Sequence, residues 1–135
     1  MQRYRGIESV RFGGAALPLP VSASLSRQAA PLPAGGDGDA YTTDVRLGRP
    51  TLTATVRLRG TAAAEALELG QAAALSITVA PAASGQAGRT LSLAGAVLAG
   101  IDLRYTQAGM AEAELRFVAE AVAGTVDPFS AEDAP

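Results

Sequence analysis

Two groups of carboxylates in this chain have a spacing that could support metal binding or acid–base catalysis. The first lies in the segment GGDGDAYTTD, where Asp37, Asp39 and Asp44 accompany Tyr41. Calcium loops also place aspartates two positions apart beside a glycine, but they continue with further oxygen ligands and end in a glutamate. Position 41 is a tyrosine and no glutamate follows at the distal position. A solvated turn therefore explains this segment better than a metal site.

The second group is Glu112 and Glu114, which lie two positions apart in a segment of alternating polarity. A strand places them on one face, about 6.6 Å apart at ~3.3 Å per residue. Paired carboxylates at such a separation suit a glycosidase. A sugar hydrolase would also need aromatic platforms, and the chain has no Trp and three Tyr. Arg116 follows on the same face, so a solvated strand face is the better explanation.

The residue types that are missing exclude most other catalysis. The chain contains no His, no Cys and no Lys, so it has no imidazole base, no thiolate nucleophile and no Schiff-base amine. A Ser-His-Asp triad is impossible, and so is a standard phosphate-binding loop, which needs Lys. We therefore expect a protein that is not an enzyme and that has no cofactor and no metal site.

The composition favours a single domain, 1–135, with a core of small side chains. Of the 135 residues 48% are hydrophobic and only 4% are aromatic, and 30 are alanine. A chain of this length can bury enough surface to fold without disulfides. Small apolar side chains bury little area each, so such a core gains from packing between subunits. An oligomer is expected on this ground.

Charge is distributed unevenly along the chain. The formal net charge is −2, yet residues 1–60 hold eight Arg and four acids, whereas residues 61–135 hold three Arg and nine acids. A net negative charge is unlike that of a protein that coats DNA. No stretch of about 20 apolar residues occurs, so neither a membrane helix nor membrane insertion is expected.

Alternating apolar residues predict an all-β fold, a sandwich or barrel of about seven strands with one short α-helix. The clearest strand is 51–59, where Leu, Ala, Val and Leu alternate with Thr and Arg. Further strands are expected at 4–12, 17–25, 73–79, 89–97, 101–106 and 110–120, and the helix at 61–69. Proline and glycine predict a flexible loop at about 28–40, and the acidic end predicts a flexible tail at about 124–135.

The order of elements in the second half resembles that of the phage tail tube and tube-like baseplate proteins of contractile injection machines. A Thr/Arg strand, TLTATVRLRG, is followed by a short helix ending in Gly, TAAAEALELG, and by the strands ALSITVA, RTLSLAGAVL and IDLRYTQAG. The last strand lies in AEAELRFVAEAVAGTVDPF. The resemblance covers about 51–129. Pro18 and Pro20 depart from it, because they interrupt an N-terminal barrel strand. A baseplate, hub or tail-completion role therefore stays open beside that of a tube.

The resemblance implies a structural virion protein. Proteins of this family stack as rings, usually of six subunits, whose sheets close into a continuous inner barrel around a polar, generally acidic channel. Asp102, Glu112 and Glu114 would line that channel. An acidic wall repels phosphate, so DNA would pass without sequence-specific binding.

The same resemblance gives a role to the first group of carboxylates and names the partners. Asp37, Asp39, Tyr41 and Asp44 would form a pliable contact between subunits or rings. The partners would be further copies of the chain, as a ring and most often a hexamer, together with other tail or baseplate proteins. The location would be the virion tail, after assembly in the host cytoplasm.

Two other classes remain open. A stand-alone β-sandwich module for binding or adhesion would also lack catalytic groups, but it would be monomeric and would carry an aromatic or loop-borne site. An enzyme that uses carboxylates alone is the third class, and it would lose activity on Glu112→Gln or Glu114→Gln.

Overall fold

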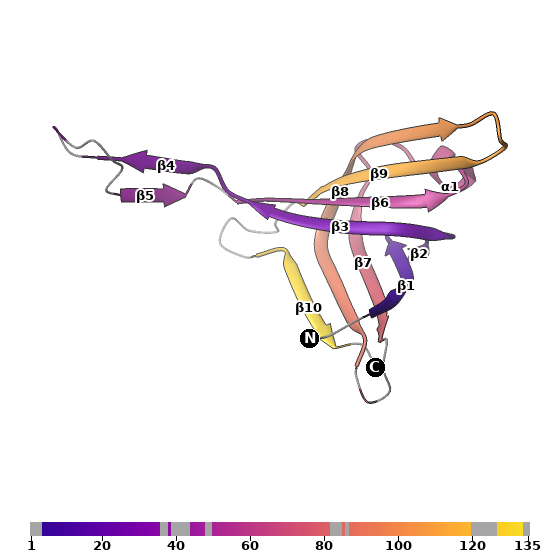
Figure 1. The fold of residues 1–135 in the computed structure, drawn as a ribbon, viewed down its shortest axis with the longest axis horizontal. Helices are drawn as coiled ribbons and strands as arrows, with labels where there is room; N and C mark the ends of the chain where they lie inside the picture. The colour runs from indigo at the N-terminus through magenta and orange to yellow at the C-terminus, as the bar shows by residue number, and fades with distance from the viewer. Residues whose placement is uncertain are drawn as a thin grey trace.

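The structure is a computed structural model that describes residues 4–35, 38, 44–47, 50–81, 85, 87–119 and 127–133. It is built almost entirely of strands, as the alternation predicts (Figure 1). The elements in chain order are β1 (Tyr4–Phe12), β2 (Ala15–Ala16), β3 (Pro20–Gln28), β4 (Pro31–Ala34), β5 (Asp44–Leu47), β6 (Thr51–Arg59), α1 (Ala62–Glu65), β7 (Ala72–Pro81), β8 (Arg89–Tyr105), β9 (Ala111–Ala119) and β10 (Phe129–Asp133).

One antiparallel sheet contains eight of these strands. Its order is β2-β1-β7-β8-β9-β6-β3, and β10 also pairs with β8. Strands β4 and β5 form a separate hairpin that projects away from this sheet (Figure 1). The all-β class with one short helix is thus confirmed.

The long strand β8 joins two halves of the sheet. Its first part, Arg89–Val97, pairs with β7, and its second part, Ala96–Tyr105, pairs with β9. Figure 1 shows β8 running from the half that contains β1 and β7 into the half that contains β6 and β9. The expected division into two strands, 89–97 and 101–106, is wrong. Gly100, which lies between them, belongs to one continuous strand that is bulged between Leu98 and Gly100.

Apolar side chains of the two halves form one core. On β6 and β9, the residues Val56, Leu115 and Phe117 are fully buried. Phe12 of β1 meets Phe117 of β9 with ring centroids 4.9 Å apart, a tilted contact that ties the two halves together. Alanine fills much of the remaining core face, as the composition indicates.

Among the described residues the sheet does not close into a barrel. In the part of the chain that the structure describes, the ladder starts at β2 and ends at β3, and these two end strands are not paired with each other. The Leu17 amide donates to the Val10 carbonyl at 2.8 Å, which extends the contact of β1 with β2 by one residue, and Leu17 is buried.

Strand β3 begins three residues later than the expected strand 17–25. Leu19 has a φ of 51°, a left-handed conformation that is unusual for a residue with a side chain. It stands between Pro18 and Pro20, and its carbonyl accepts a hydrogen bond from the Arg59 amide at 2.9 Å. The chain therefore turns at Leu19 before it enters β3, which lies at the edge of the sheet as the prolines predict.

The helix is shorter than the expected 61–69, because α1 spans only Ala62–Glu65. Thr61 precedes it but makes no side-chain bond to the backbone; its hydroxyl donates instead to Glu65 Oε1 at 3.2 Å. The Tyr105 hydroxyl donates to the same Glu65 oxygen at 2.9 Å, so side chains attach the helix to the end of β8. Gly70, which the sequence places at the end of the helix, has a left-handed φ of 87° but lies beyond the C-cap residue Ala66, so it does not end the helix.

Parts of the expected loop and tail are paired strands. Residues 31–34 of the expected loop 28–40 form β4, which is antiparallel to β5. Prolines are tolerated there because a two-stranded hairpin leaves half of its backbone groups unpaired. Residues 129–133 of the expected tail 124–135 form β10 on β8. Asp44 lies in β5, whereas Asp37, Asp39 and Tyr41 lie outside the described residues.

Candidate functional site

The outward face of β6, β9 and β8 carries a block of charged side chains that we call the charged face. Alternation buries every second residue along most of β6 and β9 and turns the others outward. The strand register aligns the outward residues in three rows across the sheet. In the order β6, β9, β8, the rows are Arg59–Glu112–Arg104, Arg57–Glu114–Asp102 and Thr55–Arg116–Gly100.

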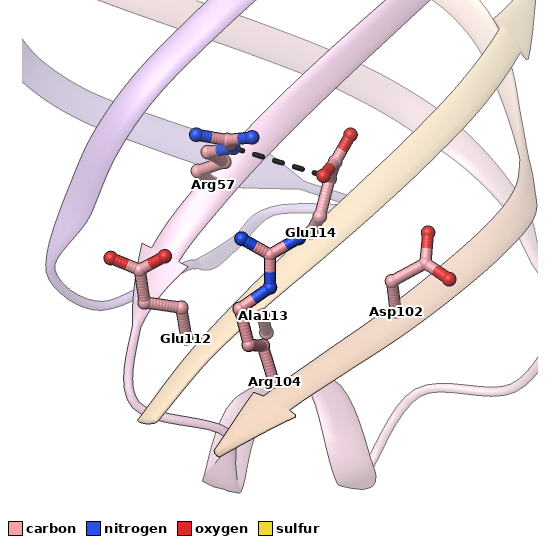
Figure 2. Close-up of a pocket in the computed structure, with 6 residues that line it drawn as sticks. All are labelled: Arg57, Asp102, Arg104, Glu112, Ala113 and Glu114. Carbon is pink, nitrogen blue, oxygen red and sulfur yellow. Dashed lines mark ion pairs between the residues drawn. The ribbon is translucent and has the colours of Figure 1, made fainter. Parts of the chain in front are cut away.

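Two ion pairs lie on the charged face, one within the middle row and one between that row and the row of Arg116. Arg57 Nε lies 3.7 Å from Glu114 Oε2, and Arg116 lies 3.6 Å from Asp102 Oδ2. The four side chains are 31% to 63% exposed, so water screens both pairs and each contributes little stability. Figure 2 shows five charged side chains around one shallow hollow, with Arg104 between the carboxylates.

The structure brings together the three carboxylates that the sequence singles out. Asp102, Glu112 and Glu114 all lie on the charged face, on two neighbouring strands. Four arginines lie among them: Arg57, Arg59, Arg104 and Arg116. The face is therefore mixed in charge rather than acidic. The sequence already places Arg116 on the face of Glu112 and Glu114. It does not indicate the other three arginines, because only the strand register shows that each of them lies opposite a carboxylate.

A row of hydroxyls extends the charged face across the edge strand. Ser22, Ser24 and Ser26 of β3 lie opposite Arg57, Thr55 and Thr53 of β6, respectively. The sequence predicts that these serines share one face of a strand, but it does not indicate which strand they adjoin. The outward surface of β3, β6, β9 and β8 is thus polar across all four strands.

The hollow at the centre of the charged face is too small for a substrate. It holds about 20 Å³, room for a single water molecule, and is lined by Arg57, Asp102, Arg104, Glu112, Ala113 and Glu114. Binding sites for small molecules are typically hundreds of cubic ångströms. The hollow is therefore far too small to hold a sugar between Glu112 and Glu114.

A larger hollow of about 370 Å³ adjoins Arg116 on the same face. Its walls are the short side chains of Thr53, Thr55 and Ala99 and the exposed side of Val118. The Arg116 side chain lies over Gly100, where a Cβ would come within 2.8 Å of the arginine Nε. The hollow is open and carries no acid or base besides this arginine.

Among the described residues, no three acidic side chains lie close enough together to hold a metal ion. No helix that the structure describes is long and apolar enough to cross a membrane.

Comparison with known proteins finds similarity in structure alone. A scan against protein-family models gives no match, and a search of curated proteins gives none either. Solved structures do match. One is a chain from the PVC sheath-tube complex of an extracellular contractile injection system in its extended state, with 17% identity and a TM-score of 0.59. The match covers 97% of this chain and 90% of that one. This chain has the same fold.

Two further matching chains come from structures of a tube-terminating cap and of a sheath/tube terminator. The anti-feeding prophage cap, which terminates the tube, matches at 17% identity and a TM-score of 0.58 over 99% of this chain and 91% of that chain. The PVC sheath/tube terminator in its extended state matches at 16% identity and a TM-score of 0.59. This match covers 98% of this chain and 96% of that chain. The resemblance to tail tube proteins is thereby confirmed at the level of the fold, over nearly the full length of each chain.

Proposed function

We propose that this protein is a structural subunit of a tail or contractile injection machine, and that copies of it form a ring around a central channel. The observation that carries the proposal is the fold shared, nearly end to end, with chains of sheath-tube, cap and terminator structures. The proposed role is mechanical and non-catalytic.

The edges of the sheet support a ring. In the half formed by β3, β6, β9 and β8, the outer edge of β3 and the Gly100–Tyr105 edge of β8 carry no strand among the described residues. These two edge strands run in opposite directions because three antiparallel steps separate them. If a neighbouring copy is related by rotation about a ring axis, its β8 lies antiparallel to the β3 of the first copy. The backbone hydrogen-bond ladder then continues from one copy to the next. Open strand edges favour such pairing.

The charged face would line the channel in this arrangement. Asp102, Glu112 and Glu114 would project into the channel beside the four arginines of the same face. A wall of mixed charge and hydroxyls binds a passing chain weakly, because attraction at one site is offset by repulsion at the next. DNA or a protein would then move through the channel without sequence-specific contacts.

The projecting hairpin suits a contact between neighbours. Strands β4 and β5 extend well beyond the main sheet (Figure 1). The segment between them carries Asp37, Asp39 and Tyr41, and Asp44 begins β5. We assign these four residues to a contact with an adjacent subunit or ring. The other partners would be tail or baseplate proteins, the location the virion tail, and the site of assembly the host cytoplasm.

Negative-stain electron microscopy over a concentration series, with mass measured on the same samples, tests the proposal. Rings or stacked tubes are the expected result, with six subunits per ring. A monomer of 13.6 kDa at every concentration would contradict self-assembly and would favour the stand-alone binding module.

A further inference from the structure

The last strand, β10, continues the path of β9 along one edge of β8. Ala119 at the end of β9 lies opposite Ala96, and Phe129 at the start of β10 lies opposite Leu93. Both strands are antiparallel to β8, and β7 occupies the other edge. The edge of β8 is therefore covered end to end by two strands that run in the same direction.

Two arginines hold β10 in place. Arg27 of β3 pairs with Asp127 at 3.0 Å and lies 4.9 Å from the centre of the Phe129 ring. Arg89 of β8 pairs with Asp133 at 2.9 Å. We call these contacts the two clamps. Both clamps consist of exposed charges, so salt screens them and they add little holding strength.

Burial also contributes little to the attachment of β10. The strand has five residues, and four of its side chains are exposed. Only Phe129 packs, half-buried, against the core. The remaining attachment is the backbone ladder to β8, together with the bond from the Ala94 amide to the Pro128 carbonyl at 2.8 Å. A short, exposed edge strand of this kind belongs to the least stable part of a fold.

The connection to β10 is longer than its path requires. Ala96 and Leu93 are three residues apart on β8, about 10 Å at ~3.3 Å per residue. Seven residues, 120–126, join the end of β9 to Asp127, which is itself paired with Arg27 beside β10. Fully extended, seven residues span about 24 Å. The connection is therefore longer than the distance along β8 that it has to bridge within one chain.

We propose that β10 is exchanged between copies, so that each assembled subunit seats the β10 of a neighbour on its own β8. The occupant is a second copy, because the seat is specific for this strand: it supplies Arg27 for Asp127, Arg89 for Asp133 and an apolar place for Phe129. The inference rests on the proposed assembly, which brings copies side by side. Exchange of an identical element is a low-cost route to linked subunits.

Cysteine cross-linking tests the exchange, since the chain has no cysteine of its own. Ser92 and Ser130 lie directly opposite each other between β8 and β10. Ser92→Cys and Ser130→Cys are made in separate full-length chains, mixed before assembly and oxidised. Only exchange brings the two cysteines together, so disulfide-linked dimers are expected from the mixture. The matched control mixes Ser130→Cys with Ser76→Cys, which lies on β7, one strand farther away.

The outcomes separate the inference from the proposed function. At least a fivefold excess of dimer in the Ser92 mixture over the Ser76 control supports exchange. Rings or tubes in the micrographs with no such excess overturn the exchange and leave the proposed function standing. A chain carrying both Ser92→Cys and Ser130→Cys gives the converse signal: oxidised monomers alone contradict exchange, and linked chains support it. Dimers in a sample without rings support exchange and contradict the ring.

Discussion

The Arg116 side chain lies directly over Gly100 on the charged face. No side chain fits at position 100 while Arg116 keeps its place, because a Cβ would lie 2.8 Å from Nε and 2.9 Å from a terminal guanidinium nitrogen. The missing side chain lets the arginine lie across β8 and reach Asp102 on the same strand. Gly100, which lies between the expected strands 89–97 and 101–106, thus leaves room for the side chain of Arg116.

Gly100→Ala is expected to change the free energy of unfolding by less than about 1 kcal/mol. The methyl group meets the movable end of Arg116, so the arginine swings away and loses its exposed contact with Asp102. In an Arg116→Ala background the same change should stabilise by about 0.4–1 kcal/mol, because alanine restricts the unfolded chain and nothing obstructs it. Urea unfolding of the four proteins measures the difference.

The control for this comparison of single and double variants is Gly109→Ala. Gly109 has a φ of 84° and no neighbour that a Cβ would meet, so its substitution is strained with or without Arg116. Equal effects of Gly100→Ala in both backgrounds would show that Arg116 is not the obstacle.

At the scale of elements, strands whose pattern is local were predictable and strands defined by distant partners were not. The alternation of β6 is complete within Thr51–Arg59, and its burial follows that pattern. The prolines of β4 and the polar residues of β10 predict irregular chain, yet each pairs with a strand whose position the sequence does not reveal. The three carboxylates were likewise found by local alternation, whereas the arginines opposite them required the register.

Arg27→Ala is expected to loosen β10 while leaving the core intact. Loss of the pair with Asp127 and of the contact with the Phe129 ring removes one of the two clamps. The Ala94 amide, which donates to Pro128, should then exchange its hydrogen several-fold faster. The Leu98 amide, which donates to Gln71, should not change. Hydrogen exchange read by NMR measures both.

Arg11→Ala is the matched control, because Arg11 is an exposed arginine on β1, on the far side of β7 from β8 and β10. Raising the salt concentration should reproduce the effect in the unmodified protein, since both clamps are screened. Equal acceleration at Ala94 and Leu98 would indicate general destabilisation and would contradict the clamp.

At the scale of the whole molecule, the charged face combines three acids with four arginines, although the chain as a whole carries a formal net charge of −2. If six copies surround a channel, the balance of this face decides how the wall treats a polyanion. Neutralising the three acids leaves the four arginines as the charges of this face. The face, which was close to neutral, then attracts phosphate.

The variant Asp102→Asn with Glu112→Gln and Glu114→Gln is expected to assemble normally and to retain single-stranded DNA that the unmodified assembly releases. Retention should fall steeply as salt rises, because the arginines act through the phosphates. The control neutralises three exposed acids elsewhere, Glu8, Glu68 and Glu132, for the same change in net charge. Filter binding on assemblies verified by microscopy measures the difference. If the variant and the control retain equal amounts of DNA, the proposal that the charged face lines the channel is contradicted.

The continuity of β8 through both halves of the sheet also has a mechanical consequence. Separate strands held by hydrogen bonds can be peeled apart one bond at a time. A single backbone of 17 residues instead carries tension between the two halves through covalent bonds. A subunit loaded along the axis of a driven shaft would therefore have to shear whole ladders on both sides of β8 at once, and it would yield abruptly rather than unzip.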